Sequence, residues 1–335
     1  MPRRITATFE VVTPLFLGGA DPSGSVELRA PSIKGALRFW WRALAWSRHN
    51  GDLGAIRTEE QKIFGAAGDD HSRLGQASFG LCARWLKEPT LRSGNPGVSY
   101  LSYGITNRGR NNSPRRYCGP GECFELTFHS LKRAGNEPGF HPSLLDAIKL
   151  FGLLGGLGRR SRRGWGSVAL VELSGEGGVL QWQAPQNLGQ YRDALSSILR
   201  STANAAEARY SAFGKGSRLH VLGVGADALA VLNPLGETYQ AFRRESANRS
   251  FIFGLPHSRF TGCAERRASP LLFHVHKLND QCALAVTFLR APFLKDRPYW
   301  EEYKKVERFL NQLPQSMREK GLTQEFSVLP RDAAA

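Results

Sequence analysis

Alternating apolar and polar residues predict four β-strands in the first half of the chain, because a half-buried strand turns successive side chains to opposite faces. These stretches, rich in β-branched and aromatic residues, cover 4–12, 76–84, 123–131 and 167–173. Apolar residues with the period of an α-helix occur at 32–44 and 142–154, with a further short helix at 53–65. The order strand, helix, strand, strand, helix, strand is that of the ferredoxin-like, or split βαβ, unit, which many RNA-recognition domains share.

The helix at 32–44 has a clear apolar side. Ser32 follows Pro31 and is expected to cap its N-terminus. Trp40 and Trp41 point about 100° apart on a helix, so we expect one in the core and the other over the sheet edge or a neighbouring subunit. The residues expected to face the core are Ile33, Leu37, Trp40, Trp41 and Leu44.

The second half of the chain gives weaker periodic signals. Strands are predicted at 179–183, 251–255, 271–277 and 283–289, and helices at 190–208 and 297–313. We interpret this half as a degenerate second copy of the same unit. The predicted fold class is therefore α+β, with two ferredoxin-like (RRM-like, βαββαβ) domains in tandem at 1–175 and 176–335.

Composition adds a partner class to this fold. The 335 residues carry a formal net charge of +16 and are 41% hydrophobic, so the chain can bury real cores and attracts polyanions. Nucleic acid comes first among partners, with an anionic membrane surface as the rival. The sequence has no apolar run of eighteen residues and no apolar signal core at its start, which predicts a cytoplasmic protein without a membrane anchor.

The five cysteines are scattered. Cys118 and Cys123 form the only near pair and have no second pair or histidine spacing to complete a zinc site. We expect reduced thiols, with no metal and no cofactor.

A loop at 152–166, GLLGGLGRRSRRGWG, carries the strongest candidate chemistry. Glycines remove the Cβ atoms that keep a ligand away from the main chain, and arginine guanidinium groups suit phosphate. Trp165 is expected to stack on a base, because a tryptophan flanked by glycines has little local core to join; folding back onto its own domain is the alternative. A solvated, flexible loop is also compatible with the pattern. The candidate RNA-binding residues here are Gly155, Gly156, Gly158, Arg159, Arg160, Arg162, Arg163 and Trp165.

A basic row lies on the helix at 32–44. Lys34, Arg38 and Arg42 are spaced four residues apart, and like charges at that spacing cost a helix a few tenths of a kcal/mol each. Because the row does not favour folding, we interpret it as a phosphate-contacting edge, with a solvated face as the alternative.

Residues 90–123 form a basic insertion with little periodicity. Arginines alternate there with Tyr100, Tyr103 and Tyr117, which gives the charge and stacking surface that single-stranded nucleic acid needs. A solvated loop is nearly as compatible. The candidate RNA-binding arginines are Arg108, Arg110, Arg115 and Arg116.

Several motifs together resemble the RAMP superfamily of CRISPR proteins. They are TPLFLGG at 13–19, LRAPSIKGALRFWWR at 28–42, GGLGRRSRRGWG at 155–166, FGLP at 253–256 and RRASPL at 266–271. Within the superfamily the pattern is similar to the first-numbered RAMP subunit of the type III-B (Cmr) effector complex. The glycine-rich motif is common to RAMP proteins, whereas PSIKGALRFWWRA is more specific. The motifs span both halves but not the insertion.

The resemblance implies a non-catalytic, RNA-binding subunit with two RRM-like domains. Such a subunit lies near the 3′ part of the guide RNA beside other Cmr RAMP subunits and helps to capture target RNA paired with the guide. The expected partners are therefore CRISPR guide RNA, target RNA and other Cmr RAMP subunits. The resemblance also adds Arg266 and Arg267 to the candidate RNA-binding residues.

Catalysis is the main alternative, because some RAMP relatives are metal-independent ribonucleases that process guide RNA with a histidine. None of the eight histidines lies in a recognisable motif; His274 and His276 share one face of a strand, where packing is the commoner role. Asp69 and Asp70 lie in a polar turn, and Gly214–Ser217 lacks the spacing of a phosphate-binding P-loop. A third hypothesis is a basic protein that docks on acidic subunits without contacting RNA.

Overall fold

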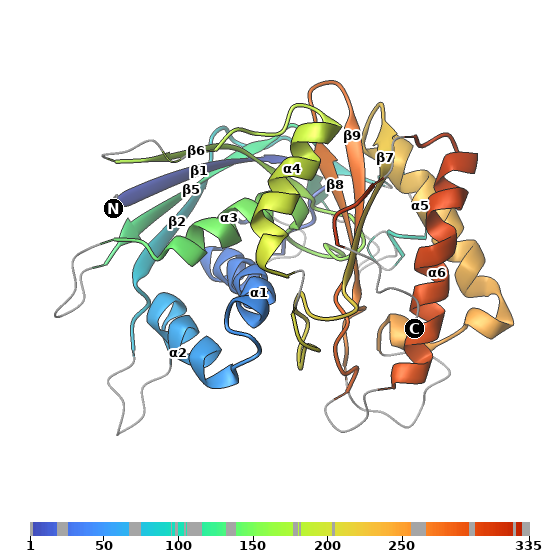
Figure 1. Cartoon of the computed structure of the whole chain (residues 1–335). Helices are drawn as coiled ribbons and strands as arrows, with labels where there is room; N and C mark the ends of the chain where they lie inside the picture. Colours follow the sequence, from blue (N-terminus) through green and yellow to red (C-terminus); the bar gives the residue numbers. More distant parts are fainter. Residues whose placement is uncertain are drawn as a thin grey trace.

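The computed structural model has an α+β architecture with antiparallel sheets (Figure 1). It describes residues 3–18, 26–66, 75–94, 96–97, 100–103, 105, 116–131, 139–176, 180, 182–202, 205–255, 266–294, 299–323 and 326–329.

The first sheet is built from β1 (Arg4–Val11), β2 (Phe79–Trp85), β5 (Cys123–Ser130) and β6 (Val168–Gly175). Its strand order is β2-β5-β1-β6, and all neighbours are antiparallel. Helices α1 (Ala30–Arg48), α2 (Leu53–Phe64) and α3 (Pro142–Leu154) lie on one side of this sheet (Figure 1). Each of these elements starts within three residues of its predicted start, which confirms the periodic signals of the first half.

The start of α1 differs from the prediction. Its N-cap is Arg29, which makes no side-chain capping bond, and Pro31 lies in the first turn. Pro31 suits that place because its missing N–H would have no helical partner there. Ser32 is therefore inside the helix, and the prediction that it caps the helix is wrong.

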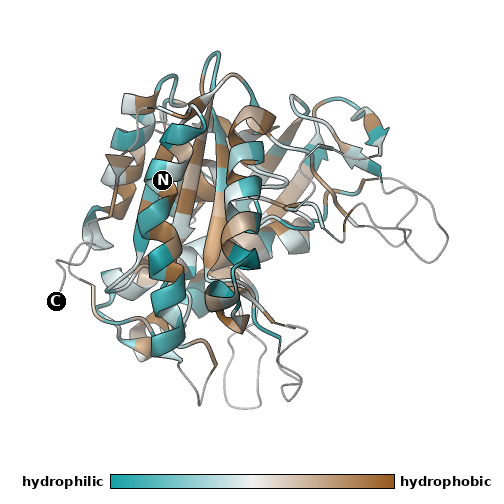
Figure 2. Cartoon of the chain, turned by 90° about the vertical axis from the view of Figure 1, so that its right-hand side faces the viewer, coloured by the Kyte–Doolittle hydropathy of each residue, from teal (hydrophilic) through white to brown (hydrophobic). Residues whose placement is uncertain are grey.

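The second sheet is built from β7 (Arg218–Gly225), β8 (Leu271–Lys277), β9 (Cys282–Phe288) and the two-residue β10 (Phe326–Ser327). Its order is β10-β7-β9-β8, again with antiparallel neighbours. Helices α5 (Ala228–Arg244) and α6 (Trp300–Glu319) cover it. Figure 2 shows largely hydrophobic strands behind helices whose outward sides are hydrophilic.

Sequence periodicity was less reliable in this half. The strand predicted at 251–255 is wrong, because the 3₁₀ turn η3 (Phe251–Phe253) lies there, and residues 180 and 182 are not in a strand. The helix predicted at 190–208 is shorter, since α4 (Leu188–Leu199) ends in the 3₁₀ turn η1 (Arg200–Thr202). Strand β7 and helix α5 were missed. The turn η2 (Ser246–Asn248) and the small sheet of β3 (Leu91–Ser93) and β4 (Arg116–Cys118) complete the described elements.

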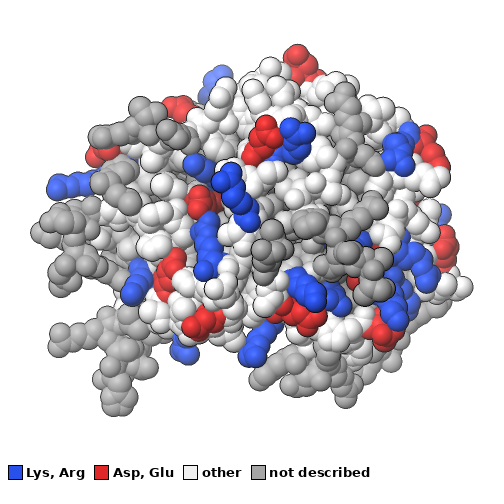
Figure 3. All heavy atoms as spheres, in the orientation of Figure 1, with Lys and Arg blue, Asp and Glu red and all other residues white. Residues whose placement is uncertain are grey.

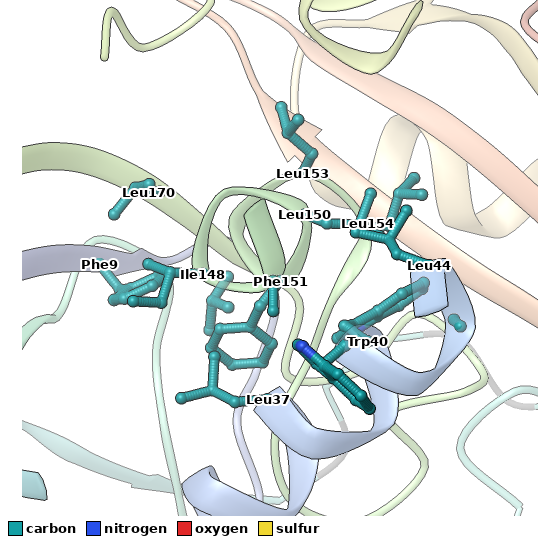
Figure 4. Close-up of a cluster of buried hydrophobic side chains, with 14 of the residues drawn as sticks. Phe9, Leu37, Trp40, Leu44, Ile148, Leu150, Phe151, Leu153, Leu154 and Leu170 are labelled. Atoms are coloured by element: carbon teal, nitrogen blue, oxygen red, sulfur yellow. The ribbon is translucent and has the colours of Figure 1, made fainter. Parts of the chain in front are cut away.

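Each sheet has its own buried apolar cluster. In the first, Leu37 and Trp40 of α1 and Phe151 of α3 point toward one another (Figure 4). Both adjacent tryptophans are buried: Trp41 donates from Nε1 to Ser143 Oγ at 2.8 Å, and Trp40 stacks on Phe213 with ring centroids 6.4 Å apart. Trp40 therefore covers neither a sheet edge nor a partner subunit; a segment after β6 in the same chain covers it.

The two sheets meet along strands β6 and β8. Val275 N donates to Ser167 Oγ at 3.1 Å, and Phe273 N donates to the Arg162 carbonyl at 3.1 Å. The loop between α3 and β6 is thus fixed on its far side by the second sheet.

Cys82, Cys118, Cys123 and Cys282 are free thiols, and Cys263 lies outside the described residues.

Candidate nucleic-acid interface

The glycines of the loop at 152–166 are required by the loop's own fold. Gly158 has φ +74°, and a Cβ there would lie 2.3 Å from the Phe16 carbonyl oxygen. Gly166 has φ +63°, and its Cβ would lie 2.1 Å from the Leu157 oxygen. L-residues with side chains avoid both the backbone conformation and the contact. The loop is therefore folded against residues 14–16 and not a flexible arch, and its glycines serve internal packing first.

Gly155 and Gly156 are restricted in the same way. A Cβ at Gly155 would lie 2.3 Å from the Phe151 oxygen, and one at Gly156 would lie 2.9 Å from the Gly166 oxygen. The Gly155 carbonyl accepts a hydrogen bond of 2.9 Å from Nδ1 of His274.

Two candidate arginine side chains of this loop, Arg162 and Arg163, turn into the protein. Arg162 lies over the ring of Phe39 and donates from Nη1 to the Ser269 carbonyl at 2.9 Å. Burial, with a smaller effect of nearby Arg267, lowers the pKa of Arg162 to about 10, so it remains charged at neutral pH. Arg163 lies over the ring of Tyr239, with Cζ 4.9 Å from the ring centroid. These two arginines join the loop to the second half of the chain.

Trp165 is fully buried, with an exposed fraction of 0%. It packs in the core cluster of the second sheet and meets Phe16 edge to face at 6.2 Å. The prediction that Trp165 stacks on a base is wrong for this fold, and the alternative that it folds back onto its own protein is correct. The sequence did not indicate this outcome, because the core that Trp165 joins is built from distant segments.

Arg159 and Arg160 are exposed at the surface. Arg159 N donates to the Phe16 carbonyl at 2.9 Å. Arg160 has φ +62°, which is uncommon for a residue with a side chain, and its Nη2 donates to the Tyr103 carbonyl at 2.5 Å. Of the four loop arginines, these two face outward.

A small hollow gathers three of the sequence motifs. It has a volume of about 260 Å³, and we call it the glycine-loop hollow. Segments 17–18, 27–36 and 156–161 line it, which places the start of α1 against the glycine-rich loop. Its lining residues are Leu17, Gly18, Glu27, Leu28, Arg29, Ser32, Ile33, Ala36, Gly156, Leu157, Gly158 and Ser161.

The basic row of α1 lines a larger groove of about 660 Å³ between α1 and α2, which we call the helix groove. Lys34, Arg38 and Arg42 lie along it together with Arg57 of α2, and Glu60 is the carboxylate among its described lining residues. These four cations and one acid give the described lining a net charge of +3. Because α-helices turn about 100° per residue, this row and the hollow-lining Ser32 and Ala36 lie on opposite flanks of the exposed face of α1.

The basic row contributes to folding, so the premise that it does not is wrong, while its contact with phosphate stays a prediction. Glu60 is 8% exposed, and its Oε1 lies 2.9 Å from Arg38 Nε and 2.7 Å from Arg42 Nη2. Arg38 Nη2 also donates to the Gly65 carbonyl at 2.9 Å. The repulsion along the row is therefore offset by an acid from α2. Lys34 lies 5.4 Å from the Phe79 ring centroid, and burial, followed by Arg38, lowers the pKa of Lys34.

The other candidate arginines are dispersed. Arg116 is exposed on β4 opposite Ser93. Arg266 is exposed, whereas Arg267 is partly buried and donates to Ser211 Oγ at 3.1 Å. Arg108, Arg110 and Arg115 lie outside the described residues. On the face seen in Figure 3, Lys and Arg side chains are interspersed with Asp and Glu and form no continuous patch.

The outer face of the first sheet lacks the stacking surface of a typical RNA-recognition domain, in which strand aromatics stack on bases. Alternate residues of β1 and β5 are buried: Phe9 and Phe124, for example, stack at 5.4 Å in the core. The outward positions of these two strands hold no Phe, Tyr or Trp; they are Arg4, Thr6, Thr8, Glu10, Cys123, Glu125, Thr127 and His129. Cationic groups instead gather at the helix groove and the glycine-rich loop.

The described histidines have structural partners or lie apart from one another. His274 and His276 are buried, and the ring of His276 stacks on Tyr191 with centroids 4.2 Å apart. Burial lowers the pKa of His276 to about 3 and that of His274 well below its usual value, so both are neutral. The packed interpretation of this pair is correct.

One polar network at α2 and the start of α3 was not predicted from the sequence. Glu59 of α2 joins His49 Nε2 at 2.6 Å and Ser143 Oγ at 2.8 Å, and His141 Nδ1 lies 2.7 Å from the same hydroxyl. His141 caps α3, since its side chain accepts from Ser143 N. The pattern His-Pro-Ser at the start of a helix was the available signal. His71 and His257 lie outside the described residues.

The described residues contain neither a membrane-spanning helix nor a metal-binding cluster. None of their helices combines the length and the apolar character needed to span a bilayer. Nor do they contain a group of three or more His, Cys, Asp or Glu side chains placed to hold a metal ion.

Comparison with known proteins identifies the class. The RAMP superfamily model matches residues 8–169. The chain is 30% identical over 275 residues to the CRISPR system Cmr subunit Cmr1-1 of Pyrococcus furiosus, covering 76% of this chain and 78% of that protein. The chain therefore belongs to the RAMP superfamily of CRISPR proteins.

Its particular relatives are Cmr1 proteins, which gives the chain the role of a Cmr subunit. The Cmr subunit Cmr1-2 of the same organism is 28% identical over 184 residues, covering 49% of this chain and 93% of that protein. The crystal structure of Cmr1 from Pyrococcus furiosus in its apo form has a TM-score of 0.66 at 23% identity and covers 97% of this chain and 98% of that one.

A subunit of the type III-B Cmr-beta complex, bound to cognate target RNA and AMPPnP, has a TM-score of 0.60 at 13% identity. The match covers 95% of this chain and 100% of that one. At these identities the two solved structures show a shared fold.

Proposed function

We propose that the chain is a non-catalytic, RNA-binding subunit of a type III-B Cmr ribonucleoprotein effector. In this role it contacts guide RNA near the 3′ end, the paired target RNA, or both, supports target capture, and adjoins other Cmr RAMP subunits. Its Cmr1 relatives and the target RNA named for the Cmr-beta structure support the proposal.

The fold proposed for this function is a pair of ferredoxin-like units. Both halves have the order strand, helix, strand, strand, helix, strand, and both sheets place their first and third strands at the centre. We place the units at 1–175 and 176–335. The second is degenerate mainly in its last strand, which is two residues long.

One observation carries the RNA-binding proposal: among the described residues, the helix groove combines Lys34, Arg38, Arg42 and Arg57 with one carboxylate. Arg42 retains 50% side-chain exposure while it pairs with Glu60. Arg42 keeps N–H donors for phosphate, because a guanidinium has five and its pair with Glu60 uses two of them. A net +3 groove on a chain of +16 fits a polyphosphate better than a neutral ligand.

The test is the affinity of the purified full chain for labelled guide RNA over a range of salt concentrations. An RNA binder should lose affinity linearly in log salt, and Lys34→Ala should flatten the slope by about one unit. A chain of +16 that docks on acidic subunits would still bind RNA weakly at low salt, but Lys34→Ala would leave the salt slope of that binding unchanged. That result would reject the proposal.

The alternative is a metal-independent endoribonuclease that processes guide RNA. The network of His49, Glu59 and His141 is the place in the described structure where such chemistry has candidates, since His141 keeps 46% side-chain exposure. Incubation of the chain with labelled guide RNA separates the two functions. Specific cleavage that disappears in His141→Ala would overturn the non-catalytic role, whereas binding without cleavage supports it.

A further inference from the structure

Tyr103 is the most exposed aromatic side chain of the described residues, with an exposed fraction of 67%. It lies on a turn in which Ile105 N donates to the Ser102 carbonyl at 2.8 Å. Residues on both sides are anchored, because Leu101, Ser102 and Ile105 are all buried to 1% exposure or less. The ring therefore projects from a fixed backbone, and few rotamers are lost when a ligand covers it.

Arg160 ties this turn to the glycine-rich loop. Its Nη2 donates to the Tyr103 carbonyl at 2.5 Å, and its own carbonyl accepts from Arg163 N at 2.7 Å. Arg160 holds the left-handed backbone conformation, φ +62°, in which a side chain is disfavoured. A conformation of that kind persists where the surroundings impose it, and such places are often binding sites. Here it directs the Arg160 guanidinium to the backbone carbonyl of the residue that carries the exposed ring.

The surroundings of Tyr103 are strongly cationic. Burial, followed by the charges of Arg163 and Arg159, lowers the pKa of Arg160. Arg243 and Arg244, in the last turn of α5, act on neighbouring Tyr100 together with Arg163. Among the described residues, no carboxylate is a main influence on the pKa of Arg160 or Tyr100. Arginines of the glycine-rich loop therefore lie near the turn at 100–103 at Arg160, and those of α5 lie near the same turn at Tyr100.

We propose that Tyr103 and Arg160 form a stacking site for one unpaired base of a single-stranded RNA, with the surrounding arginines holding the adjoining phosphates. An exposed ring beside guanidinium groups supplies both parts that single-stranded nucleic acid needs, a stacking platform and a cationic track. An acidic protein partner would also use both the arginines and the ring, and the comparison of base-bearing with abasic RNA separates the two kinds of ligand. The proposal rests on the RNA-binding function and adds the site and the chemical group that it takes.

The experiment compares two oligonucleotides of equal length with the full chain. One is single-stranded oligouridine, and the other carries abasic ribose units at its central positions, so that the phosphates remain and the bases are absent. We expect wild-type protein to bind oligouridine more tightly. Tyr103→Ala should weaken oligouridine binding by about five- to hundredfold and leave the abasic strand unchanged. Tyr103→Phe, which keeps the ring, should retain the preference.

Two further variants complete the test. Arg244→Ala should weaken both strands equally and flatten the salt slope by about 0.7. Leu86→Ala, which removes another exposed apolar side chain (50%), is the matched control and should change neither affinity. The inference is overturned if Tyr103→Ala weakens both strands equally or weakens neither while wild type binds RNA. If wild type binds neither strand, the RNA-binding function itself fails.

Discussion

The guanidinium of Arg162 lies over the ring of Phe39, with Cζ 5.0 Å from the ring centroid. This contact joins the glycine-rich loop to helix α1, while the hydrogen bond from the same side chain to the Ser269 carbonyl joins it to the second half. Arg162 is therefore a structural link among three segments that all belong to the RAMP-like motifs, and it offers little surface to a ligand.

We expect Arg162→Ala to destabilise the protein by about 2–4 kcal/mol, because a charge-assisted hydrogen bond and a desolvated cation–π contact are both lost. Arg162→Lys should restore little, since an ammonium group cannot stack its plane on Phe39 and reach Ser269 together. Urea denaturation measures the change. A fall in RNA affinity of the folded variant with no loss of stability would contradict this role.

We expect substitution of Arg42 to affect RNA binding, whereas substitution of Arg162 affects stability. Because half of its side chain is exposed in the helix groove, Arg42→Ala should flatten the log-affinity against log-salt slope for single-stranded RNA by about 0.7. Arg84→Ala is the matched control: this arginine is exposed and also pairs with a glutamate, Glu125, but it lies on the outer face of the first sheet. If the two substitutions changed the slope equally, the helix groove would contact RNA no more than the outer face of the first sheet does.

Gly158 and Gly18 both line the glycine-loop hollow but differ in what a side chain would meet. Gly158→Ala should cost at least about 2 kcal/mol, because its φ is +74° and the new Cβ would meet a carbonyl oxygen at 2.3 Å. At Gly18 a Cβ meets nothing within 4 Å, so Gly18→Ala should change stability by less than about 1 kcal/mol. Thermal melts of both variants check this; equal losses would show that the loop is not held in this conformation.

His276 predicts a pH dependence of stability. Burial lowers its pKa in the folded protein to about 3, against 6.5 in an unfolded chain. Between these values the unfolded chain takes up a proton that the folded protein does not, so stability is complete above pH 6.5 and falls as the pH falls toward 3. From pH 7.5 to 5.0 this histidine should remove about 2 kcal/mol.

The measurement is urea denaturation at both pH values for wild type and His276→Phe. The phenylalanine keeps an aromatic ring against Tyr191 and has no titrating group, so the variant should lose about 2 kcal/mol less than wild type over this pH range. If wild type and His276→Phe lost the same free energy of unfolding between pH 7.5 and 5.0, His276 would be accessible to protons in the folded state.

The amino-acid pattern alone determined the elements of the first sheet, since the period of apolar residues is a local property that survives without knowledge of the partner. It also determined α3 to the residue, because Pro142 and Gly155 mark its ends. In the second half it missed α5, although Val231, Leu235 and Tyr239 have helical spacing, because Pro234 interrupts the same stretch. The motifs sufficed to indicate the RAMP superfamily.

Only the tertiary structure decided which of the candidate side chains face outward. Arg162 and Trp165 have the same local signature as Arg159 and Arg160, yet the first two meet a core built from residues far away in the sequence. Likewise, the sequence showed no acidic partner for the basic row of α1, because Glu60, which pairs with Arg42, lies on another helix. The period of apolar residues shows which side of a helix or strand is buried. It does not show which residue from a distant segment will pair with a given side chain. That pairing decided whether each arginine turns into the protein or toward its surface.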